Sequence, residues 1–338
     1  MTDLNFLSDL KSKSYITNSY VHQNDIFDRM QKCLFELQKE EGLFCFYKNT
    51  NYQFKQLFLY FTNDFFLGDK VINFKNYSLV AEMVSLKKNL TQRIQISNCL
   101  NRCGFFHYRT FLRMFLINIS TYENVDFSQI AKPVESDYEL IKTLLESSFD
   151  IYSERIPTAD ELRLLEEGVF IIKENNQIAA VLISEVKGKT SELRYWLVSP
   201  EYRHRGFGGI LMKYYLTKNK EINRYTLWVD SSNQNAIDKY KYFGFNEDKI
   251  MNTIYINMNI MKDKVKEILV DTRPEFDFAD SAVNFMEAGY LDSFDIITIV
   301  ADLESAFDVK ILGSLIVPES FVSIESIVKL VQDCKDAS

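Results

Sequence analysis

The clearest pattern of apolar and polar positions lies in the second third of the chain. Short apolar or alternating runs, bounded by Asn-Asn and Lys-Gly turns, predict β-strands. Ser136 and Thr158 each stand three residues before a glutamate, the capping-box signature of a helix start, and Gly168 is expected to end the second of these helices. The expected order is ααβββαβαβ. Its strands cover residues 169–173, 177–186, 191–198, 225–230 and 253–259.

Beyond Met261 the apolar positions repeat only with the period of a helix. They predict three helices, around residues 265–269, 296–307 and 324–331, and no strand. We therefore expect an α/β protein with a mixed central sheet, followed by a small all-α bundle of roughly 75 residues.

The α/β part contains an apparent internal repeat. Residues 37–62 and 162–186 both show a helix end, a Glu-Glu-Gly stop, a strand, a polar turn and a strand. Residues 100–119 and 240–259 both show a helix end, a Gly-Phe corner and a closing strand. A duplication of about 130 residues explains the agreement, although two unrelated α/β segments could also match by chance. The domains expected from these patterns are 1–130, 131–260 and 261–338.

The net charge of −8 is not spread evenly over the 338 residues. From Asp271 onward there are 14 acidic and 4 basic residues, a net charge of −10, whereas the remainder has 33 acidic and 35 basic residues, a net charge of +2. Such a step in charge indicates a boundary between units with different partners.

Several classes of function are excluded at this level. The acidic first residues do not resemble a secretory signal, and no apolar run approaches the ~18 residues of a membrane span, so a cytoplasmic protein is expected. The 5 cysteines are odd in number and lack the spacing of a metal or redox motif. Without a basic excess, nucleic acid is not an expected partner.

A glycine-rich turn joins an expected strand to an expected helix. Arg203, Gly206 and Gly208 form an R-x-x-G-x-G pattern there. Glycines let the backbone approach a ligand closely, and free N–H groups at a helix start favour a pyrophosphate. Taken alone the pattern is also compatible with a tight turn.

The surrounding residues give this turn a context. Together with Leu197-Val198-x-Pro200 and the later N-x-x-A-x-x-x-Y-x-x-x-G-F pattern, it resembles the GNAT superfamily of acyl-CoA N-acyltransferases. The resemblance implies an acyl-CoA substrate, with acetyl-CoA the common case. It implies that Val198 pairs with the pantetheine arm and that Asn233 binds the same arm. It assigns the pyrophosphate to the amides of Arg203, His204, Arg205, Gly206, Phe207, Gly208 and Gly209.

Two residues are expected to move protons. Tyr240 occupies the family's tyrosine position and would protonate the departing thiolate, since a phenol with a pKa near ~10 can serve a thiolate near ~8.5 to 9. Glu192, at the start of the strand before the loop, would accept the proton of the amine, with Asp230 as a second candidate. The alternatives are a core-packing tyrosine and an ordinary strand-end glutamate.

The first copy lacks a recognisable loop. The stretch of residues 74–100, where the loop was expected, contains no glycine, so a pyrophosphate cradle is not expected there.

The acidic tail carries a second resemblance. The strings GYLDSF, LESAFDVKI and VPESFVSIESIVKLV resemble acyl, peptidyl and D-alanyl carrier proteins. This implies 4′-phosphopantetheine on Ser293, attached by a phosphopantetheinyl transferase, with Phe294 in place of the usual leucine. Acidic Asp295, Asp302 and Glu304 would meet assembly-line or acyl-activating enzymes with basic surfaces. The simpler interpretation is that Ser293 is a helix N-cap.

Taken together, these features predict an N-acyltransferase with a fused carrier that holds the donor or the acceptor as a thioester, in a biosynthetic assembly pathway. Two alternatives remain open. The acyltransferase domain could load, and even decarboxylate, an acyl group on its own carrier arm, or the whole chain could be a noncatalytic carrier scaffold.

Overall fold

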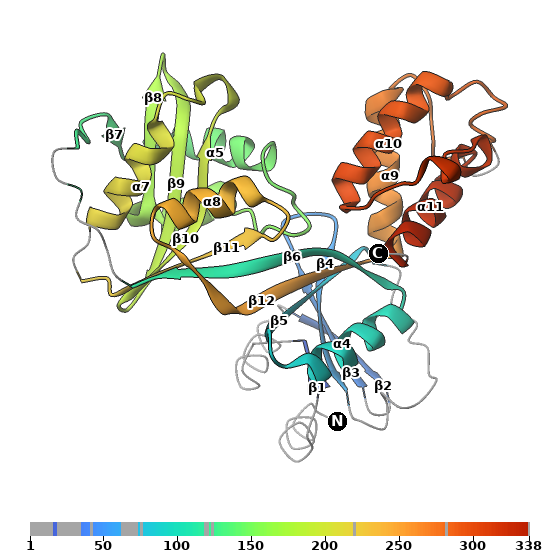
Figure 1. The fold of residues 1–338 in the computed structure, drawn as a ribbon, viewed down its shortest axis with the longest axis horizontal. Helices are drawn as coiled ribbons and strands as arrows, with labels where there is room; N and C mark the ends of the chain where they lie inside the picture. Colours follow the sequence, from blue (N-terminus) through green and yellow to red (C-terminus); the bar gives the residue numbers. More distant parts are fainter. Residues whose placement is uncertain are drawn as a thin grey trace. The chain divides into compact units, whose positions relative to one another are not determined.

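The computed structural model describes residues 16–18, 35–40, 43–61, 74, 77–117, 122, 125–218, 221–280 and 283–336. The chain forms two compact units. Unit 1 comprises Met1–Arg109 and Thr253–Ser338, and unit 2 comprises Thr110–Asn252. Figure 1 shows the elements of both, and we describe each unit by itself.

Unit 2 is built on a mixed sheet with strand order β6-β11-β10-β9-β8-β7. Its strands pair antiparallel except β10 and β11, which are parallel. A parallel pair needs a crossover connection, and here helix α7 provides it. The strands are β6 (Phe105–Leu116, shared with unit 1), β7 (Ile130–Ala131), β8 (Val169–Glu174), β9 (Gln177–Lys187), β10 (Thr190–Val198) and β11 (Arg224–Asp230).

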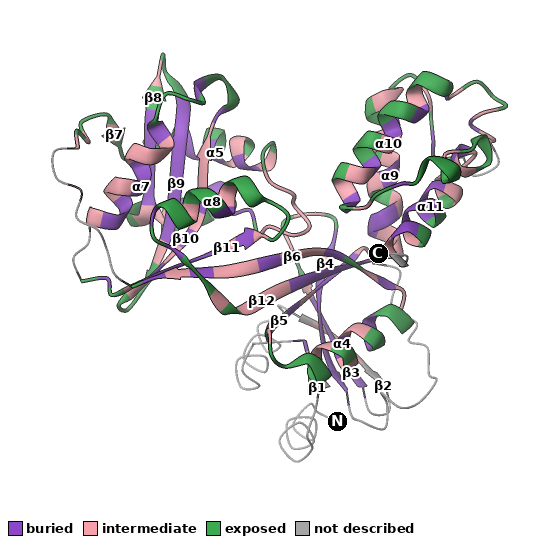
Figure 2. Ribbon diagram, viewed as in Figure 1, coloured by how far each residue is buried: buried purple, intermediate pink, exposed green. Residues whose placement is uncertain are grey.

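Helices cover both faces of this sheet, and strands β8 and β9 between them are largely buried (Figure 2). Helices α5 (Asp137–Glu146) and α6 (Ala159–Leu164) bury their apolar side chains on one face. Helices α7 (Phe207–Lys218) and α8 (Gln234–Tyr242) pack on the other. The expected order ααβββαβαβ is therefore present in the structure.

Local signals at the helix ends were partly misread. Thr158 does form a capping box with Glu161, as predicted. Ser136 makes no capping hydrogen bond; Asp137 instead accepts one from Val134 N at 2.8 Å, in a buried position where it also pairs with Lys173. Gly168 ends a short 3₁₀ turn after α6, and a Cβ there would lie 1.8 Å from the backbone oxygen of Ser184. The close approach of β9 therefore explains this glycine better than a helix cap does.

Unit 1 repeats the strand plan of unit 2. Its strands β2, β3 and β4 are antiparallel, and β4 is parallel to β5, as β10 is to β11. Residues 35–40 form a strand, so the helix end expected from residue 37 is wrong. The elements are β1 (Ile16–Thr17), β2 (Phe35–Glu40), β3 (Leu43–Asn49), β4 (Lys55–Phe61), β5 (Leu79–Leu86) and α4 (Leu90–Arg102).

The strand order of unit 1 shows that its counterpart of the phosphate loop lies elsewhere than expected. The connection equivalent to the β10–β11 crossover lies between β4 and β5, at residues 62–78, and it includes Gly68. The glycine-free stretch 74–100 instead covers β5 and α4, which correspond to β11 and α8. The expectation that this stretch replaces the loop was therefore wrong, and residues 62–73 lie outside the described part.

The closing strands of the two halves are exchanged. In unit 2 the neighbour of β11 is β6, which pairs from Tyr225↔Leu116 to Asp230↔Phe111. In unit 1 the neighbour of β5 is β12 (Asn246–Asn257). Within unit 2, Asp248 joins the exchanged elements, because its carboxylate lies 3.3 Å from Arg113 Nε of β6 and 3.0 Å from Arg224 Nη2 of β11.

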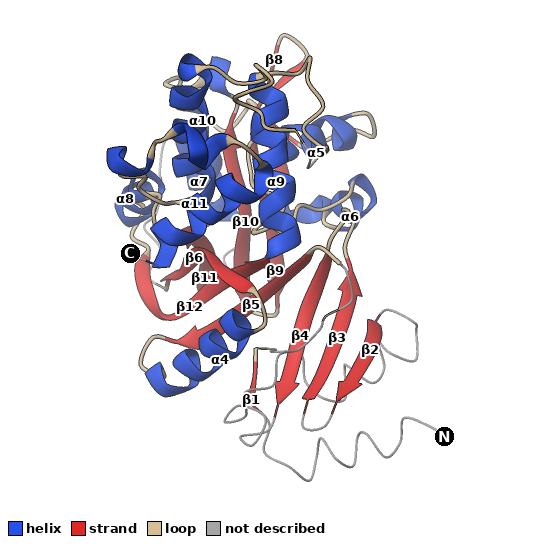
Figure 3. Ribbon diagram, turned by 90° about the vertical axis from the view of Figure 1, so that its right-hand side faces the viewer, coloured by secondary structure: helices blue, strands red, loops and turns tan. Residues whose placement is uncertain are grey.

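The C-terminal residues form helices α9 (Met258–Thr272), α10 (Ser293–Phe307) and α11 (Ile324–Asp336), shown in Figure 3. All three predicted helices are present. The first starts earlier than expected because Asn257 ends β12 and caps α9, accepting from Ile260 N at 3.5 Å. The same Asn257 accepts from Leu79 N at 2.9 Å, which ties α9 to the start of β5.

Candidate active site

The site is built where two parallel strands separate. Strands β10 and β11 pair from Thr190↔Arg224 to Leu193↔Leu227 and no further. A bulge then displaces β10 between Leu193 and Tyr195, after which β10 pairs with β9 alone. Along residues 195–198, the edge of β10 that would face β11 therefore borders an opening. Backbone groups on that edge need hydrogen-bond partners from a ligand or from water.

The bulge also reverses which side chains face which helices. Ser191 and Leu193 pack toward α7, and the Ser191 hydroxyl lies 2.8 Å from that of Tyr215. Beyond the bulge, Trp196 and Val198 join this face, while Tyr195 packs toward α5 and α6. Large side chains of β10 thus line both sides of the opening.

A firmly anchored loop follows β10. Ser199 Oγ donates to Ile178 O at 2.7 Å, and Ser199 N donates to Ala179 O at 2.9 Å. The backbone then takes positive φ angles at His204 (67°) and Gly206 (82°) before α7 begins at Phe207. The first amide to enter the helical pattern is that of Ile210, which donates to Gly206 O at 3.1 Å.

The loop therefore presents a row of donors. Within the described residues, the N–H groups of residues 204–209 make no hydrogen bond to a backbone oxygen outside α7, and the helix itself can satisfy none of its first amides. The helix dipole adds partial positive charge at the same point. All seven residues carried over from the family pattern lie together here: Arg203, His204, Arg205, Gly206, Phe207, Gly208 and Gly209.

Close packing fixes the start of α7. A Cβ on Gly208 would lie 3.1 Å from Val198 Cγ2 and 3.3 Å from the Trp196 ring, and Trp196 Nε1 donates to Gly208 O at 3.0 Å. Around Gly209 there is open space within 4 Å. Gly208 is thus a packing requirement, whereas Gly209 keeps the surface open.

Positive charge surrounds the loop on the solvent side. The side chains of Arg203, His204 and Arg205 are exposed. Arg205 lies 3.6 Å from Glu174 and over the Tyr202 ring. Such exposed pairs are weak, so Arg205 can turn to an anionic ligand at little cost.

Helix α8 and its N-cap carry Asn233 and Tyr240, the two residues expected near the opening. Asn233 is its N-cap, and its Oδ1 accepts from Ala236 N at 3.0 Å, so the Nδ2 group is the part of the amide that can serve a ligand. The Tyr240 ring packs on Trp196, with ring centroids 5.5 Å apart. Burial raises the pKa of the Tyr240 phenol, and the negative charge of Glu154 raises it further. The phenol therefore stays protonated at neutral pH.

Glu192 lies on the opposite face of the sheet from Tyr240. It stands between Ser191 and Leu193, which face α7, so its own side chain faces the side of α5 and α6. Its Oε1 lies 3.9 Å from Arg194 Nε, and Arg194 also contacts Glu185 at 3.2 Å. The structure thus places Glu192 in a charged cluster rather than beside the tyrosine.

Asp230, the second candidate base, forms hydrogen bonds within its own turn. Its Oδ1 accepts from Ser232 N at 2.9 Å and from Ser232 Oγ at 2.8 Å, which shapes the turn from β11 into α8. Its carboxylate is therefore engaged in positioning Asn233.

The sequence reasoning missed Glu154. It lies in the 147–158 connection between α5 and α6, which β10 holds in place because Tyr195 Oη donates to Arg155 O at 2.6 Å and the Tyr195 ring contacts Phe149. After burial, its negative charge is the second cause of the raised pKa of the Tyr240 phenol. No local pattern marks this glutamate, since Glu154 and Tyr240 come from segments that are distant in the sequence.

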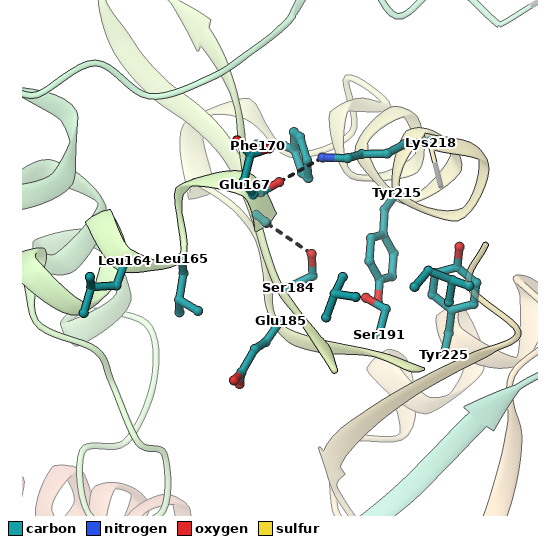
Figure 4. Close-up of a pocket in the computed structure, with 13 residues that line it drawn as sticks. Leu164, Leu165, Glu167, Phe170, Ser184, Glu185, Ser191, Tyr215, Lys218 and Tyr225 are labelled. Carbon is teal, nitrogen blue, oxygen red and sulfur yellow. Dashed lines mark hydrogen bonds between the residues drawn. The ribbon is translucent and has the colours of Figure 1, made fainter. Parts of the chain in front are cut away.

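A pocket of about 510 Å³ lies elsewhere in unit 2 (Figure 4). It sits at the C-terminal end of α7, where Lys218 donates to Glu167 O at 2.8 Å and Tyr215 points toward Ser191. The first α7 residue that lines it, Tyr215, lies eight residues and about 12 Å beyond the start of the helix at the loop. It is therefore not part of the candidate active site.

Ser293, the expected attachment residue, is exposed at the first position of α10. The N-cap is Asp292 rather than the serine, and Asp295 completes a capping box with it. Arg273 holds this corner, with Nε 2.9 Å from Asp295 Oδ2 and Nη2 3.3 Å from Asp292 Oδ2. The interpretation of Ser293 as an ordinary N-cap was wrong, so its hydroxyl is not used by the helix start.

The surface beside Ser293 is apolar. Phe294 is 81% exposed and Ile297 is 69% exposed. Two of the three acidic residues expected to recognise partners are engaged within the chain, since Asp295 pairs with Arg273 and Glu304 accepts from Ile311 N at 2.8 Å.

The described residues form neither a metal-ion cluster nor a membrane-spanning helix. No group of three or more His, Cys, Asp or Glu side chains in that part of the chain is placed to hold a metal ion. None of the helices described there combines the length and hydropathy needed to cross a bilayer.

A comparison with known protein families matches the segment that contains this candidate site. The profile of the Acetyltransferase (GNAT) family matches residues 137–245. The ribosomal protein bS18-alanine N-acetyltransferase of Escherichia coli (strain K12) is 29% identical over 98 residues, which is 28% of this chain and 66% of that protein. The chain thus spans just under two thirds of the length of this curated relative.

Two solved structures of acetyltransferases are similar to parts of the chain. The glucosamine N-acetyltransferase region of a fungal multi-domain GH3 β-N-acetylglucosaminidase, described as GCN5-related, is similar at a TM-score of 0.50 and 11% identity, over 75% of this chain and 37% of that one. A GCN5-related N-acetyltransferase from Sphaerobacter thermophilus is similar at a TM-score of 0.45 and 12% identity, over 64% of this chain and 76% of that one. With the splayed strands, the donor row at α7 and the family match all in one segment, residues 137–245 form a GNAT-family N-acetyltransferase domain.

Proposed function

We propose that the chain transfers an acyl group, with acetyl the simplest case, from acyl-CoA to an amine at the end of the β10–β11 opening. The observation that carries this proposal is the row of free amides at residues 204–209, directly beside strands that separate after Leu193 and Leu227. An anion is stabilised at such a helix start, and an extended amide chain can pair with the open edge of a strand.

Each part of the cofactor then has a partner. The pyrophosphate binds the amides of residues 204–209, with Arg203 and Arg205 adding charge from the solvent side. The pantetheine arm enters the opening, where the backbone of Val198 and the Nδ2 group of Asn233 supply hydrogen bonds. The adjacent Trp196 and Tyr240 rings exclude water from the thioester end.

The chemical step needs one proton donor and one proton acceptor. The neutral amine nitrogen attacks the thioester carbonyl, the C–N bond forms and the C–S bond breaks. Tyr240 gives its proton to the leaving thiolate of coenzyme A, and the amine gives a proton to a carboxylate, directly or through water. Glu154 and Glu192 are the candidate carboxylates, on the side of the sheet that carries α5 and α6.

Of these two we favour Glu154, because its charge acts on Tyr240 whereas Arg194 lies beside Glu192. Glu154→Gln is expected to lower kcat/KM for the amine by about 100-fold or more, a typical contribution of general base catalysis, and to leave acetyl-CoA binding unchanged. Glu192→Gln, the matched control, is expected to change kcat/KM by less than about 3-fold. Steady-state kinetics at several pH values provides the test. If the fall of kcat/KM at low pH disappeared in Glu192→Gln and not in Glu154→Gln, Glu192 would be the base instead.

The C-terminal helices support a second proposal, a carrier domain. The observation that favours it is that Ser293 is exposed at the start of α10, is not used as a cap, and lies beside the exposed Phe294 and Ile297. A 4′-phosphopantetheine arm on Ser293 would hold one reactant as a thioester at high effective concentration. The division into domains 1–130, 131–260 and 261–338 belongs to this proposal.

Partner enzymes would then meet a surface that is more apolar than its net charge suggests. With Asp295 and Glu304 engaged within the chain, Asp302 is the member of the predicted acidic trio that stays exposed, and it lies on the same helix as Phe294 and Ile297. A partner with an apolar groove and a basic rim fits this surface.

Intact-protein mass spectrometry after coexpression with a phosphopantetheinyl transferase tests both proposals. The wild-type chain is expected to gain one phosphopantetheine adduct, Ser293→Ala none, and the exposed control Ser314→Ala one. With acetyl-CoA added, acetylation of an amine is expected; the amines tried should include an alanine amine, since the Escherichia coli relative is named for one.

The same experiment separates the alternatives. Acylation of the arm thiol itself, without an amine product, would favour the loading function, and loss of mass as carbon dioxide from a malonyl arm would favour decarboxylation. An adduct without any acyl transfer would favour the scaffold. Absence of the adduct on wild type would remove the carrier proposal and leave the acyltransferase proposal standing.

A further inference from the structure

Unit 1 contains a splay of the same kind as the candidate active site. Strands β4 and β5 are parallel and pair from Lys55↔Leu79 to Leu57↔Ala81. Beyond this point β4 continues to Phe61 and β5 to Leu86 without pairing to each other. The geometry matches that of β10 and β11, whose pairing stops after Leu193↔Leu227.

A segment of the chain itself fills this splay. Strand β1 pairs antiparallel with β4, with Ile16 opposite Phe61 and Thr17 opposite Tyr60. In the described part of unit 2, by contrast, β10 has only β9 and β11 as neighbours, so no third strand enters its splay.

Asn18 closes the point at which the strands separate. Its Oδ1 accepts from Leu59 N at 2.6 Å, and its Nδ2 donates to Leu57 O at 3.1 Å and to Glu82 O at 3.0 Å. One amide thus satisfies two backbone groups of β4 and one of β5. The side chain is 4% exposed, so these bonds are shielded from water.

From this geometry we infer that the β4–β5 splay is a binding site for an extended peptide strand, occupied in the protein by its own residues 16–18, and therefore closed to acyl-CoA. A pantetheine arm entering there would have to displace β1 and leave three buried backbone groups without partners. Such groups are costly to leave unpaired. Of the two splays in the described part of the chain, only the one in unit 2 is then open to coenzyme A.

Hydrogen exchange on the full chain tests the occupied splay. In Asn18→Ala the Leu59 amide loses its acceptor and is expected to exchange about tenfold faster, the change that follows from one hydrogen bond of ordinary strength. Asn18→Asp, which turns a carboxylate oxygen toward Leu57 O and Glu82 O, is expected to exchange faster still. Asn89→Ala is the control, because Asn89 is exposed and makes no side-chain capping bond. Unchanged exchange at Leu59 in both Asn18 variants would overturn the inference.

Binding stoichiometry supplies an independent arm. Calorimetric titration with coenzyme A is expected to give one binding site on the wild-type chain. Hydrogen exchange measured with the ligand present is expected to show no added protection of the amides of Leu79–Leu86. Two sites, or protection of that strand, would show that the splay of unit 1 admits the cofactor. A chain that binds no coenzyme A at all would count against the proposed acyltransferase, while the exchange result would still decide the occupancy of the splay.

Discussion

Replacing Gly206 and Gly208 together by glutamate is expected to weaken coenzyme A binding by roughly 100-fold or more. Gly206 has a φ of 82°, which strains any other residue, and a side chain on Gly208 would press on Val198 and Trp196 at the root of α7. The two carboxylates would also face the pyrophosphate. Loss of two backbone hydrogen bonds to an anion, each worth about 1.5 to 3 kcal/mol, corresponds to an affinity loss of this size.

The control is Gly313→Ala, in a short 3₁₀ turn (Gly313–Leu315) outside the loop. A Cβ there meets nothing within 4 Å, so coenzyme A binding should be unchanged within about 3-fold and the chain should be more stable by about 0.4 to 1 kcal/mol. Isothermal calorimetry measures affinity and thermal unfolding measures stability. Wild-type affinity in the double variant, with an intact circular dichroism spectrum, would sink the assignment of this loop.

Tyr240→Phe is expected to lower kcat by about 100-fold or more while leaving the affinity for acetyl-CoA nearly unchanged. The ring packing on Trp196 survives the change, so only the proton donor is lost. Tyr242→Phe, on the same helix but 81% exposed, should keep wild-type kinetics. Pre-steady-state release of coenzyme A thiol, followed with a thiol reagent, would isolate the chemical step.

The pH dependence has a definite sign. The phenol acts while it is protonated, and burial together with Glu154 raises its pKa above the usual value near ~10. Activity limited by this group is therefore retained as pH rises and should show no tyrosine-dependent decline below about pH 10. A decline between pH 7 and 9 that disappears in Tyr240→Phe would contradict the assigned role, as would equal kcat values for the two enzymes.

Local features of the second half could be predicted from the sequence because they depend on neighbours along the chain. The strand-to-helix glycine turn, the capping box at Thr158 and the tyrosine of α8 each carry a short pattern, and the structure places them as expected. The boundaries of β8 to β11 agree to within one residue for the same reason, since apolar period and turn residues are local properties.

The rest could not be predicted because it depends on partners that are distant in sequence. The residue 35–40 segment, expected as a helix end, is a strand because β3 pairs with it. Glu154 and Tyr240 come from segments far apart in the chain, and Asn18 closes β4 and β5 from about 40 residues or more away. An apolar pattern indicates that a strand exists, but not which strand lies beside it.

The exchange of closing strands has a consequence for how this protein can be made. During synthesis, β6 leaves the ribosome long before β11, with which it pairs in unit 2. In the same way β5 emerges long before β12, its neighbour in unit 1. Neither sheet is complete until residue 257 has been synthesised, so cotranslational folding of the first half must pause with an unpaired strand edge. A gene fragment cut between the two halves would leave both fragments with a missing strand. The two halves are therefore expected to fold only when they are expressed as one piece.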